Sequence, residues 1–255
     1  MSHVVSDDRP FWKVAPIDRR GYEVIAASFV GLTIVYSLVG LMIVEWWDPS
    51  GAGTVDADIS RWFERNRTDR LTEFAHVGSA LSDTVTKIAM TVVLAGVLLM
   101  MYRRWHDWAL LGVGLLLEVA VFGTASEVAR RDRPPVEQLD GAPTNSWPSG
   151  HIAASVVFYV GIAVIVFWNT RRVWSRVLAV MIAVLCPSIV LWSRMYLGMH
   201  YATDAVAGVV LGFTCLAIVA WALRRTAGSS LSYVAVDAVD DVVQDAGGAR
   251  PTVSS

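Results

Sequence analysis

Long runs of apolar residues, separated by short polar segments, make up most of this 255-residue chain. Six runs approach the roughly 20 residues that an α-helix needs to cross a bilayer. They cover about residues 22–46, 85–102, 108–128, 152–169, 174–192 and 201–223. An α-helix satisfies its own backbone hydrogen bonds and can therefore cross the hydrocarbon core of the bilayer. The pattern predicts an all-α fold, a bundle of six transmembrane helices.

The polar segments divide the chain into one membrane domain at residues 21–225, an N-terminal tail at 1–20 and a C-terminal tail at 226–255. The first tail is polar and partly basic. The second is rich in small and acidic residues and has no sustained period, so we expect it to be disordered.

The longest connection between runs is residues 47–84, the first outer loop. Within it Val55, Ile59 and Phe63 recur at four-residue spacing, with Trp62 beside them. This spacing predicts a short amphipathic helix. It fits equally a helix that lies in the headgroup layer and one that packs over the bundle.

Composition agrees with a membrane protein, because 55% of the residues are hydrophobic and 17% are charged. Average soluble domains carry about 25% charged residues. The two cysteines, Cys186 and Cys215, fall inside apolar runs and are expected to be small core residues. No nucleotide-binding loop or nucleic-acid patch is present in the sequence.

Basic residues gather before the first run, between the second and third, between the fourth and fifth, and after the sixth. They are Arg9, Lys13, Arg19, Arg20, Arg103, Arg104, Arg171, Arg172, Arg176, Arg224 and Arg225. By the positive-inside rule these segments are cytoplasmic. We therefore expect a multi-pass protein of the plasma (inner) membrane with both termini in the cytoplasm and the loops 47–84, 129–151 and 193–200 outside.

Three polar clusters then fall on the predicted outer side. Residues 129–135 (ARRDRPP) follow the third span, residues 147–151 (WPSGH) precede the fourth, and residues 193–204 (SRMYLGMHYATD) join the fifth to the sixth. Because all three clusters lie at one side of the membrane, residues far apart in sequence can meet in one plane of the bundle.

Several of these residues suit an anion. Arg133 and Arg194 are permanent cations whose forked donors match phosphate oxygens. Ser149 offers a hydroxyl and Gly150 allows close backbone approach, at a helix start whose free N–H groups attract negative charge. Pro148 is expected in the first helical turn, where a missing N–H is tolerated.

Two histidines add proton-transfer chemistry. His200 and Asp204 are four residues apart and share a helical face. A carboxylate there can hold one ring nitrogen protonated and leave the other as nucleophile or base. His151, in the second cluster, can donate a proton to a leaving oxygen. Two histidines, two arginines and no acidic pair indicate phosphoryl transfer without a metal or other cofactor, and Asp204 alone would be a poor magnesium site.

These clusters resemble the signatures of the type 2 phosphatidic acid phosphatase superfamily of membrane lipid phosphatases. The family's Pro-Ser-Gly-His signature is intact at residues 148–151. Its signature of Ser-Arg, five residues, His, three residues and Asp is intact as Ser193-Arg194, His200 and Asp204. The six-span layout fits as well, so the resemblance covers roughly residues 20–225.

The remaining family signature, Lys, six residues, Arg-Pro, is incomplete. Arg133-Pro134 is present, but Ser126 stands where the family has a lysine that helps to bind phosphate. Arg130 lies one helical turn beyond Ser126 and Arg131 is adjacent. We expect one of these two arginines to supply the missing charge.

The resemblance implies a role for each matched residue. His200 would attack phosphorus and form a phosphohistidine, Asp204 would orient it, and His151 would protonate the leaving group and then activate water. The phosphoryl oxygens would be held by Arg133, Ser149, Gly150 and Arg194, with Arg130 as the added cation.

The implied activity is hydrolysis of a lipid phosphate or diphosphate on the outer leaflet, with polyprenyl diphosphates first, then phosphatidylglycerol phosphate or phosphatidic acid. The expected partners are the lipid substrate and membrane lipids, with no nucleic acid, and the oligomeric state is open. Two alternatives remain: a lipid phosphotransferase on the same site, and a catalytically silent lipid-binding member, which the missing lysine favours.

Glu118 lies inside the third run, where a charge costs about 2.5–3.5 kcal/mol on insertion scales. The Glu118 side chain could be protonated or paired and face the interior of the bundle. Alternatively, it could contact a lipid headgroup. The sequence leaves both readings open.

Overall fold

The computed structural model describes residues 17–51, 53–82, 105–141 and 145–248, with backbone only for 105–108 and 227–248. Every regular element in these ranges is a helix, which confirms the predicted all-α class. The expected second span, residues 85–102, lies outside the described residues.

Five helices of the described part are long and apolar enough to cross a membrane. The first is α1 (Arg19–Met42), extended by a π-helical segment at Ile43–Trp47. The next is α5 (Trp105–Ala129). The third consists of α6 (Gly150–Ser155), a π-helical segment (Val156–Val160) and α7 (Gly161–Asn169). Then follow α8 (Val173–Tyr196) and α9 (Ala202–Gly248).

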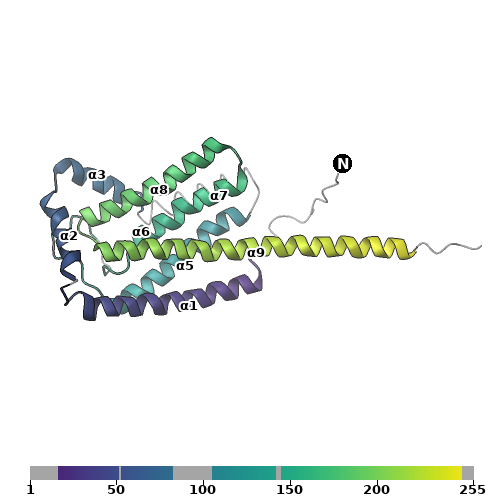
Figure 1. Cartoon of the computed structure of the whole chain (residues 1–255), viewed down its shortest axis with the longest axis horizontal. Helices are drawn as coiled ribbons and strands as arrows, with labels where there is room; N and C mark the ends of the chain where they lie inside the picture. Colours follow the sequence, from purple (N-terminus) through teal and green to yellow (C-terminus); the bar gives the residue numbers. More distant parts are fainter. Residues whose placement is uncertain (1–16, 52, 83–104, 142–144, 249–255) are drawn as a thin grey trace, which may run out of the picture.

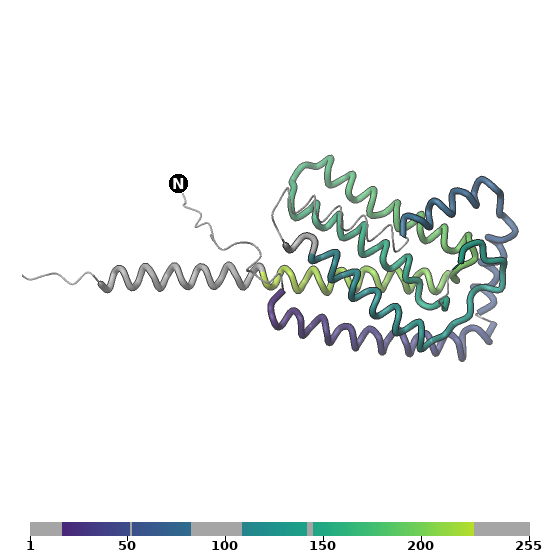
Figure 2. Tube along the Cα trace, turned by 180° about the vertical axis from the view of Figure 1, so that it is seen from behind, coloured from purple at the N-terminus to yellow at the C-terminus, as the bar shows by residue number. Residues whose placement is uncertain are grey.

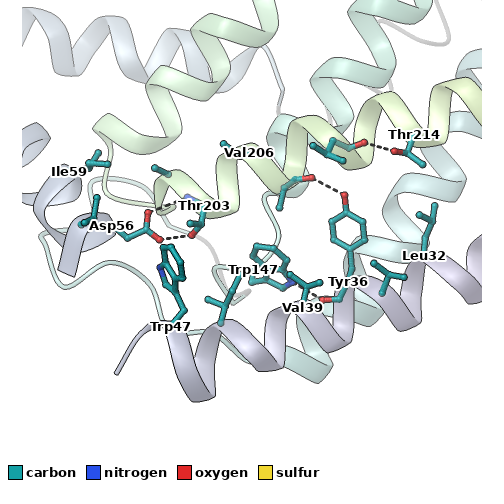
Figure 3. A pocket seen from close by; sticks show the side chains of 16 residues that line it. Leu32, Tyr36, Val39, Trp47, Asp56, Ile59, Trp147, Thr203, Val206 and Thr214 are labelled. Atoms are coloured by element: carbon teal, nitrogen blue, oxygen red, sulfur yellow. Dashed lines mark hydrogen bonds between the residues drawn. The ribbon is translucent and has the colours of Figure 1, made fainter. Parts of the chain in front are cut away.

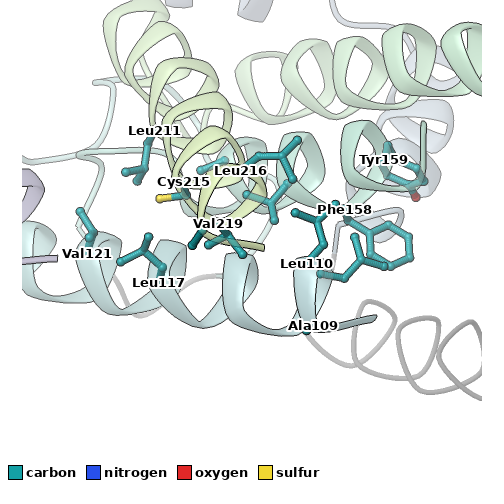
Figure 4. Close-up of a cluster of buried hydrophobic side chains, with 14 of the residues drawn as sticks. Ala109, Leu110, Leu117, Val121, Phe158, Tyr159, Leu211, Cys215, Leu216 and Val219 are labelled. Carbon is teal, nitrogen blue, oxygen red and sulfur yellow. The ribbon is translucent and has the colours of Figure 1, made fainter. Parts of the chain in front are cut away.

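Helix α9 is the central element of the bundle. Figures 1 and 2 both show it between α1 on one side and α8 on the other, with α5 crossing beside it. A cluster of buried apolar side chains joins α9 to α5 and to the π-helical segment before α7 (Figure 4); it includes Leu211, Cys215 and Val219 of α9, Val121 of α5 and Phe158. Burial of such side chains contributes roughly 25 cal/mol per Å² relative to water. Between helices that are surrounded by lipid, van der Waals packing of these side chains stabilises the bundle instead.

Glycines let α9 approach the helix that begins at residue 150. A Cβ at Gly208 would stand 2.6 Å from the Ser149 carbonyl oxygen, and one at Gly212 would stand 2.5 Å from the Ala153 carbonyl oxygen. Small residues at helix contacts are typical of membrane bundles for this reason. The approach fixes the start of α6 against the start of α9.

Two helices occupy the connection at residues 47–84, which the sequence predicted to lie outside and to hold one helix. Helix α2 (Gly53–Arg65) carries the expected apolar residues, and α3 (Asp69–Ala80) follows it, capped by the Thr68 hydroxyl. Phe63 packs edge-on against Tyr196, with ring centroids 6.3 Å apart, and Trp62 is exposed. The apolar face of α2 is thus partly used within the bundle.

Helix α9 extends into the segment that we predicted to be a C-terminal tail. Helix α9 does not end with the apolar run near Leu223 but continues to Gly248, so residues 226–248 have a helical backbone. Proline is absent between Ala202 and Gly248, and the stretch is rich in alanine, a strong helix former. A helix already started in the membrane needs no new nucleation to extend.

Candidate active site

The three polar clusters meet at one end of the bundle. In Figure 1 this is the end where α2 and α3 lie, where α8 finishes and where α6 and α9 begin. Backbone hydrogen bonds hold the connecting segments together: Leu139 N–H to Leu197 O at 3.0 Å, Ser146 N–H to Arg131 O at 2.9 Å and Ser149 N–H to Asp204 O at 3.3 Å. The prediction that distant clusters share one plane is therefore met in the fold.

His200 is buried in the turn between α8 and α9. Its Nδ1 lies 2.8 Å from the Ser146 carbonyl oxygen, to which it donates its proton. This hydrogen bond fixes the Nδ1–H tautomer and leaves the Nε2 lone pair available. The expected direct bond to Asp204 is not formed, because Asp204 Oδ2 stands 3.9 Å from Nδ1.

The surroundings keep His200 neutral. Burial lowers its pKa well below the ordinary histidine value, and the positive charges of Arg194, Arg133 and His151 lower it further, against an opposing contribution from the Ser146 carbonyl. A neutral imidazole with its proton on Nδ1 is the form that can act as a nucleophile through Nε2.

Asp204 serves other partners instead. Its Oδ1 accepts a hydrogen bond from Arg131 at 2.6 Å, and its Oδ2 accepts from the Tyr201 N–H at 2.9 Å and from the Ser146 hydroxyl. The carboxylate is fully buried. Asp204 and His200 are thus linked through Ser146, which bonds to both of them.

Arg131 cannot supply the phosphate-binding charge missing at Ser126. All five of its N–H groups donate hydrogen bonds. Nε–H and one N–H of Nη2 donate to Asp48, at 3.0 and 2.6 Å, and the other N–H of Nη2 donates to Asp56 at 3.1 Å. The two N–H groups of Nη1 donate to Thr203, at 2.7 Å, and to Asp204. Burial alone would lower the pKa of Arg131, but Asp48 and Asp204 raise it above the ordinary value. Of the two expected arginines, only Arg130 remains.

Arg130 ends helix α5 in a left-handed conformation, with φ of 49°. Its side chain is exposed, and its Nε donates to the Glu127 carbonyl oxygen at 3.1 Å. Ser126 itself is buried, and its carbonyl accepts from the Asn145 side chain at 3.0 Å.

Arg133 and Arg194 place two positive charges beside His200. Arg133 donates to the Met199 carbonyl, and Arg194 donates to Ser79 Oγ at 2.9 Å and to Asp140 Oδ2 at 2.6 Å. Burial lowers the pKa of Arg133, and the nearby charge of Arg194 lowers it further. Two cations held close together form an environment that favours a bound anion.

The helix start at Ser149 has the predicted polar character with one shift. Ser149 is the N-cap of α6 and Gly150 its first residue, so Pro148 precedes the helix rather than occupying its first turn. The Ser149 side chain makes no capping bond. His151 follows in the first turn, and its carbonyl accepts a hydrogen bond from Ser82 Oγ.

Sequence reasoning missed the residues that support these side chains. Ser146 has the nearest signal, since it directly precedes the WPSGH cluster. Asp48 and Asp56 come from the first outer loop, Asp140 from the loop before α6, and Ser79 from α3. Each was an isolated polar residue in a connecting segment, with no spacing that linked it to a motif.

A cavity of about 650 Å³, here called the α1–α9 groove, adjoins the site. Its walls are mainly apolar, and Figure 3 shows Tyr36 and Val39 of α1 facing Val206 and Thr214 of α9. Asp56 and Thr203, both partners of Arg131, line the groove together with Trp147. Trp147 directly follows Ser146, so the groove and the histidine share their supporting loop.

Comparison with known families matches residues 107–227 to the PAP2 superfamily, which confirms the resemblance predicted from the motifs. The chain is 32% identical over 107 residues to YbjG of Escherichia coli K12, a provisionally assigned undecaprenyl-diphosphatase; this covers 40% of the chain and 50% of that protein. It is 29% identical over 154 residues to phosphatidylglycerophosphatase B of Bacillus subtilis 168, covering 56% of the chain and 68% of that protein. The chain thus spans about half the length of the first relative.

Two solved structures share the fold. The chain superposes on a transmembrane PAP2-type phosphatidylglycerolphosphate phosphatase of Bacillus subtilis with a TM-score of 0.65 and 22% identity, covering 75% of this chain and 93% of that one. It also resembles LpxE of Aquifex aeolicus, with a TM-score of 0.50, 18% identity and coverage of 64% and 92%. These likenesses establish the helical membrane fold.

Proposed function

We propose that this chain, whose residues 107–227 match the PAP2 superfamily, is an integral membrane phosphatase that hydrolyses a lipid phosphate or diphosphate. The observation that carries the proposal is His200: a buried imidazole, bonded through Nδ1–H to a carbonyl and flanked by Arg133 and Arg194. A neutral nucleophile beside two cations suits attack on a phosphoryl group whose oxygens carry negative charge.

The proposed reaction has two steps. His200 Nε2 forms a bond to phosphorus while the bond from phosphorus to the leaving oxygen breaks, and His151 gives that oxygen a proton. His151 then takes a proton from water, which attacks the phosphohistidine and releases phosphate and free His200. Arg133, Arg194 and the Ser149–Gly150 helix start would hold the phosphoryl oxygens, with Arg130 as an additional cation.

The substrate proposed first is a polyprenyl diphosphate, followed by phosphatidylglycerol phosphate and phosphatidic acid. The first two choices follow the names of the relatives, an undecaprenyl-diphosphatase and a phosphatidylglycerophosphatase. The α1–α9 groove supports a substrate with a long hydrocarbon chain, because it offers about 650 Å³ of mainly apolar space beside the catalytic loop.

The protein crosses the membrane several times. We place both termini in the cytoplasm and the site on the extracytoplasmic side of the plasma membrane, as the distribution of basic residues indicates. The described basic residues Arg171 and Arg172 lie at the opposite end of the helices from His200, between α7 and α8, which fits this orientation.

The experiment is phosphate release by purified protein in detergent, from a panel of lipid phosphates and diphosphates, with a chelator present. His200→Ala is the test variant. His76→Ala, an exposed histidine on α3, is the matched control. We expect release that survives the chelator and the control substitution and is lost in His200→Ala. A label that is stable in base but lost in acid should distinguish the phosphohistidine from serine and threonine phosphoesters, which survive acid.

Two other outcomes point to the alternatives. Phosphate that leaves only when an acceptor lipid is added would identify a phosphotransferase. A folded protein that binds the lipids but turns none over, with or without acceptor, would favour a silent member and contradict the proposal.

A further inference from the structure

Arg131 lies near the site with five side-chain hydrogen bonds, and the proposed reaction does not use it. It is 1% exposed and, besides its five hydrogen bonds, lies over the Tyr201 ring with its guanidinium carbon 4.1 Å from the ring centroid. We call this group the Arg131 cluster; its members are Arg131, Asp48, Asp56, Thr203 and Asp204. Buried ion networks contribute little net stability compared with apolar packing, and their best-attested benefit is a defined geometry.

The geometry that the Arg131 cluster defines is the position of Ser146. Arg131 reaches this residue twice. Its backbone carbonyl accepts the Ser146 N–H at 2.9 Å. Its guanidinium holds Asp204 at 2.6 Å, and Asp204 in turn accepts the Ser146 hydroxyl. The backbone N–H and the side-chain hydroxyl of Ser146 are therefore both held. The Ser146 carbonyl oxygen accepts the hydrogen bond from His200 Nδ1.

The same contacts keep Asp204 away from His200. The carboxylate is engaged by Arg131, Ser146 and the Tyr201 N–H and stops 3.9 Å from Nδ1. A carboxylate bonded directly to the ring would favour the imidazolium, whereas a neutral carbonyl orients the proton with less effect on charge. The charged or titratable groups that face His200 are Asp204 from α9, Arg194 from α8, Arg133 from the loop and His151 from α6.

We propose that Arg131 is a positioning residue for His200. By holding Asp204 and, through it, Ser146, Arg131 presents the Ser146 carbonyl to Nδ1–H and keeps the nucleophile in one neutral tautomer with Nε2 free. The catalytic consequence rests on the proposed function, because it takes His200 as the nucleophile. Arg131 has no donor left for substrate, so its effect appears in kcat rather than in KM.

The test compares Arg131→Lys with Ser146→Ala and Ser146→Thr. Lysine keeps the charge but has three donors on one nitrogen and cannot bridge three carboxylates and Thr203. Alanine at 146 removes the link to Asp204 and leaves the Arg131 ion pairs intact, whereas threonine restores the hydroxyl. We expect kcat to fall roughly 10- to 100-fold in Arg131→Lys and Ser146→Ala, the scale of a small misplacement of a reacting group. KM should stay within about twofold, and Ser146→Thr should recover most of the activity.

A second readout is the state of His200 itself. In protein labelled with ¹⁵N-histidine, the His200 signals are identified by their absence from His200→Asn. We expect one neutral Nδ1–H form at pH 7 in the wild type. In Arg131→Lys we expect a shift toward imidazolium, because the released Asp204 can approach the ring. In Ser146→Ala, where Arg131 still holds Asp204, we expect a mixture of tautomers, because the Ser146 carbonyl is no longer fixed through its hydroxyl.

Unchanged kcat and an unchanged single neutral form in both folded variants would overturn the inference. If Arg131→Lys does not fold, Ser146→Ala and Ser146→Thr decide alone. The two proposals fail in different experiments. A wild type that releases no phosphate contradicts the proposed function. The tautomer of His200 and its response to Ser146→Ala test the role of Arg131 independently of turnover.

Discussion

At the scale of single residues, the charges around His200 lead to a prediction on pH. Burial lowers the pKa of His200, and the charges of Arg194 and Arg133 lower it further, so the imidazole stays neutral at pH values where an ordinary histidine, with a pKa of about 6.5, is protonated. Activity that needs neutral His200 is therefore retained when the pH falls below the ordinary histidine pKa. It is lost only at the lower pH at which His200 itself becomes protonated. Removing one positive charge raises the pKa of His200 and moves the acid limb of kcat/KM to higher pH.

Arg133→Gln is the variant for this measurement and Arg133→Lys is its control, because lysine keeps the charge. Both bind phosphate less well than arginine, but only the glutamine variant should displace the acid limb. Ionisation of the substrate is common to all three proteins and cancels in the comparison. Coincident limbs in wild type and Arg133→Gln would contradict the assignment of the limb to His200.

Arg130 gives a second prediction at this scale. A non-glycine residue at positive φ costs about 1–2 kcal/mol, and glycine is the usual residue at this position after a helix. Arg130 lies one helical turn from Ser126, and an arginine stands there although glycine would avoid the strain. This indicates that the arginine side chain has a function. We expect Arg130→Gly to keep or raise the melting temperature and to weaken inhibition by inorganic phosphate or vanadate.

The comparison for Arg130 is Ser126→Ala. If Arg130 supplies the charge that the family draws from a lysine, turnover should fall far more in Arg130→Ala and Arg130→Gly than in Ser126→Ala. Equal and small effects in all three would show that this part of the site works without the added cation.

At the scale of elements, the contact between α9 and the start of α6 sets the position of Ser149 and Gly150, which we proposed to hold the phosphoryl oxygens. A methyl group at Gly208 would meet the Ser149 carbonyl oxygen at 2.6 Å. We expect Gly208→Ala to lower the free energy of unfolding by about 1–3 kcal/mol, as overpacking does, and to reduce kcat because Ser149 and Gly150 are displaced. Gly31→Ala in α1 is the control, since no atom lies within 4 Å of its added Cβ. Thermal unfolding in detergent and turnover measure both effects.

The α1–α9 groove leads to a prediction about chain length. Val206 and Val210 line the groove from α9. Tryptophan at either position should fill the space and raise KM for a long-chain polyprenyl diphosphate about tenfold, while a short-chain lipid phosphate is turned over as before. Val184→Trp, on an exposed part of α8 outside the groove, serves as control. Equal KM changes for long and short chains would place the hydrocarbon chain elsewhere.

Hydropathy and spacing predicted the spans and the motif residues, but not the side chains that orient them. Runs of about 20 apolar residues are a local property, and five of the six predicted runs are helical in the described part of the chain. The i, i+4 spacing of His200 and Asp204 predicted that the carboxylate orients the ring; the structure keeps the two 3.9 Å apart, with Ser146 and Arg131 bonded to the carboxylate. Those partners lie 58 and 73 positions from Asp204, and no local pattern brings them together.

At the scale of the whole molecule, the orientation in the membrane decides which leaflet the site serves. The His200 end of the bundle carries the long loops, and the opposite end carries Arg171 and Arg172. Positive charge is retained on the cytoplasmic side during insertion, so the histidine end should face outward. Such a site would act on lipids of the outer leaflet only.

Single cysteines at the two ends test this orientation. In a background with Cys186 and Cys215 replaced, Gln138→Cys marks the loop before α6 and Arg171→Cys marks the turn between α7 and α8; both positions are exposed. We expect a membrane-impermeant maleimide to label Gln138→Cys in intact cells and Arg171→Cys only after permeabilisation. The reverse pattern would place the site in the cytoplasm, and the substrate would then have to be sought among inner-leaflet lipids even if the chemistry at His200 is as proposed.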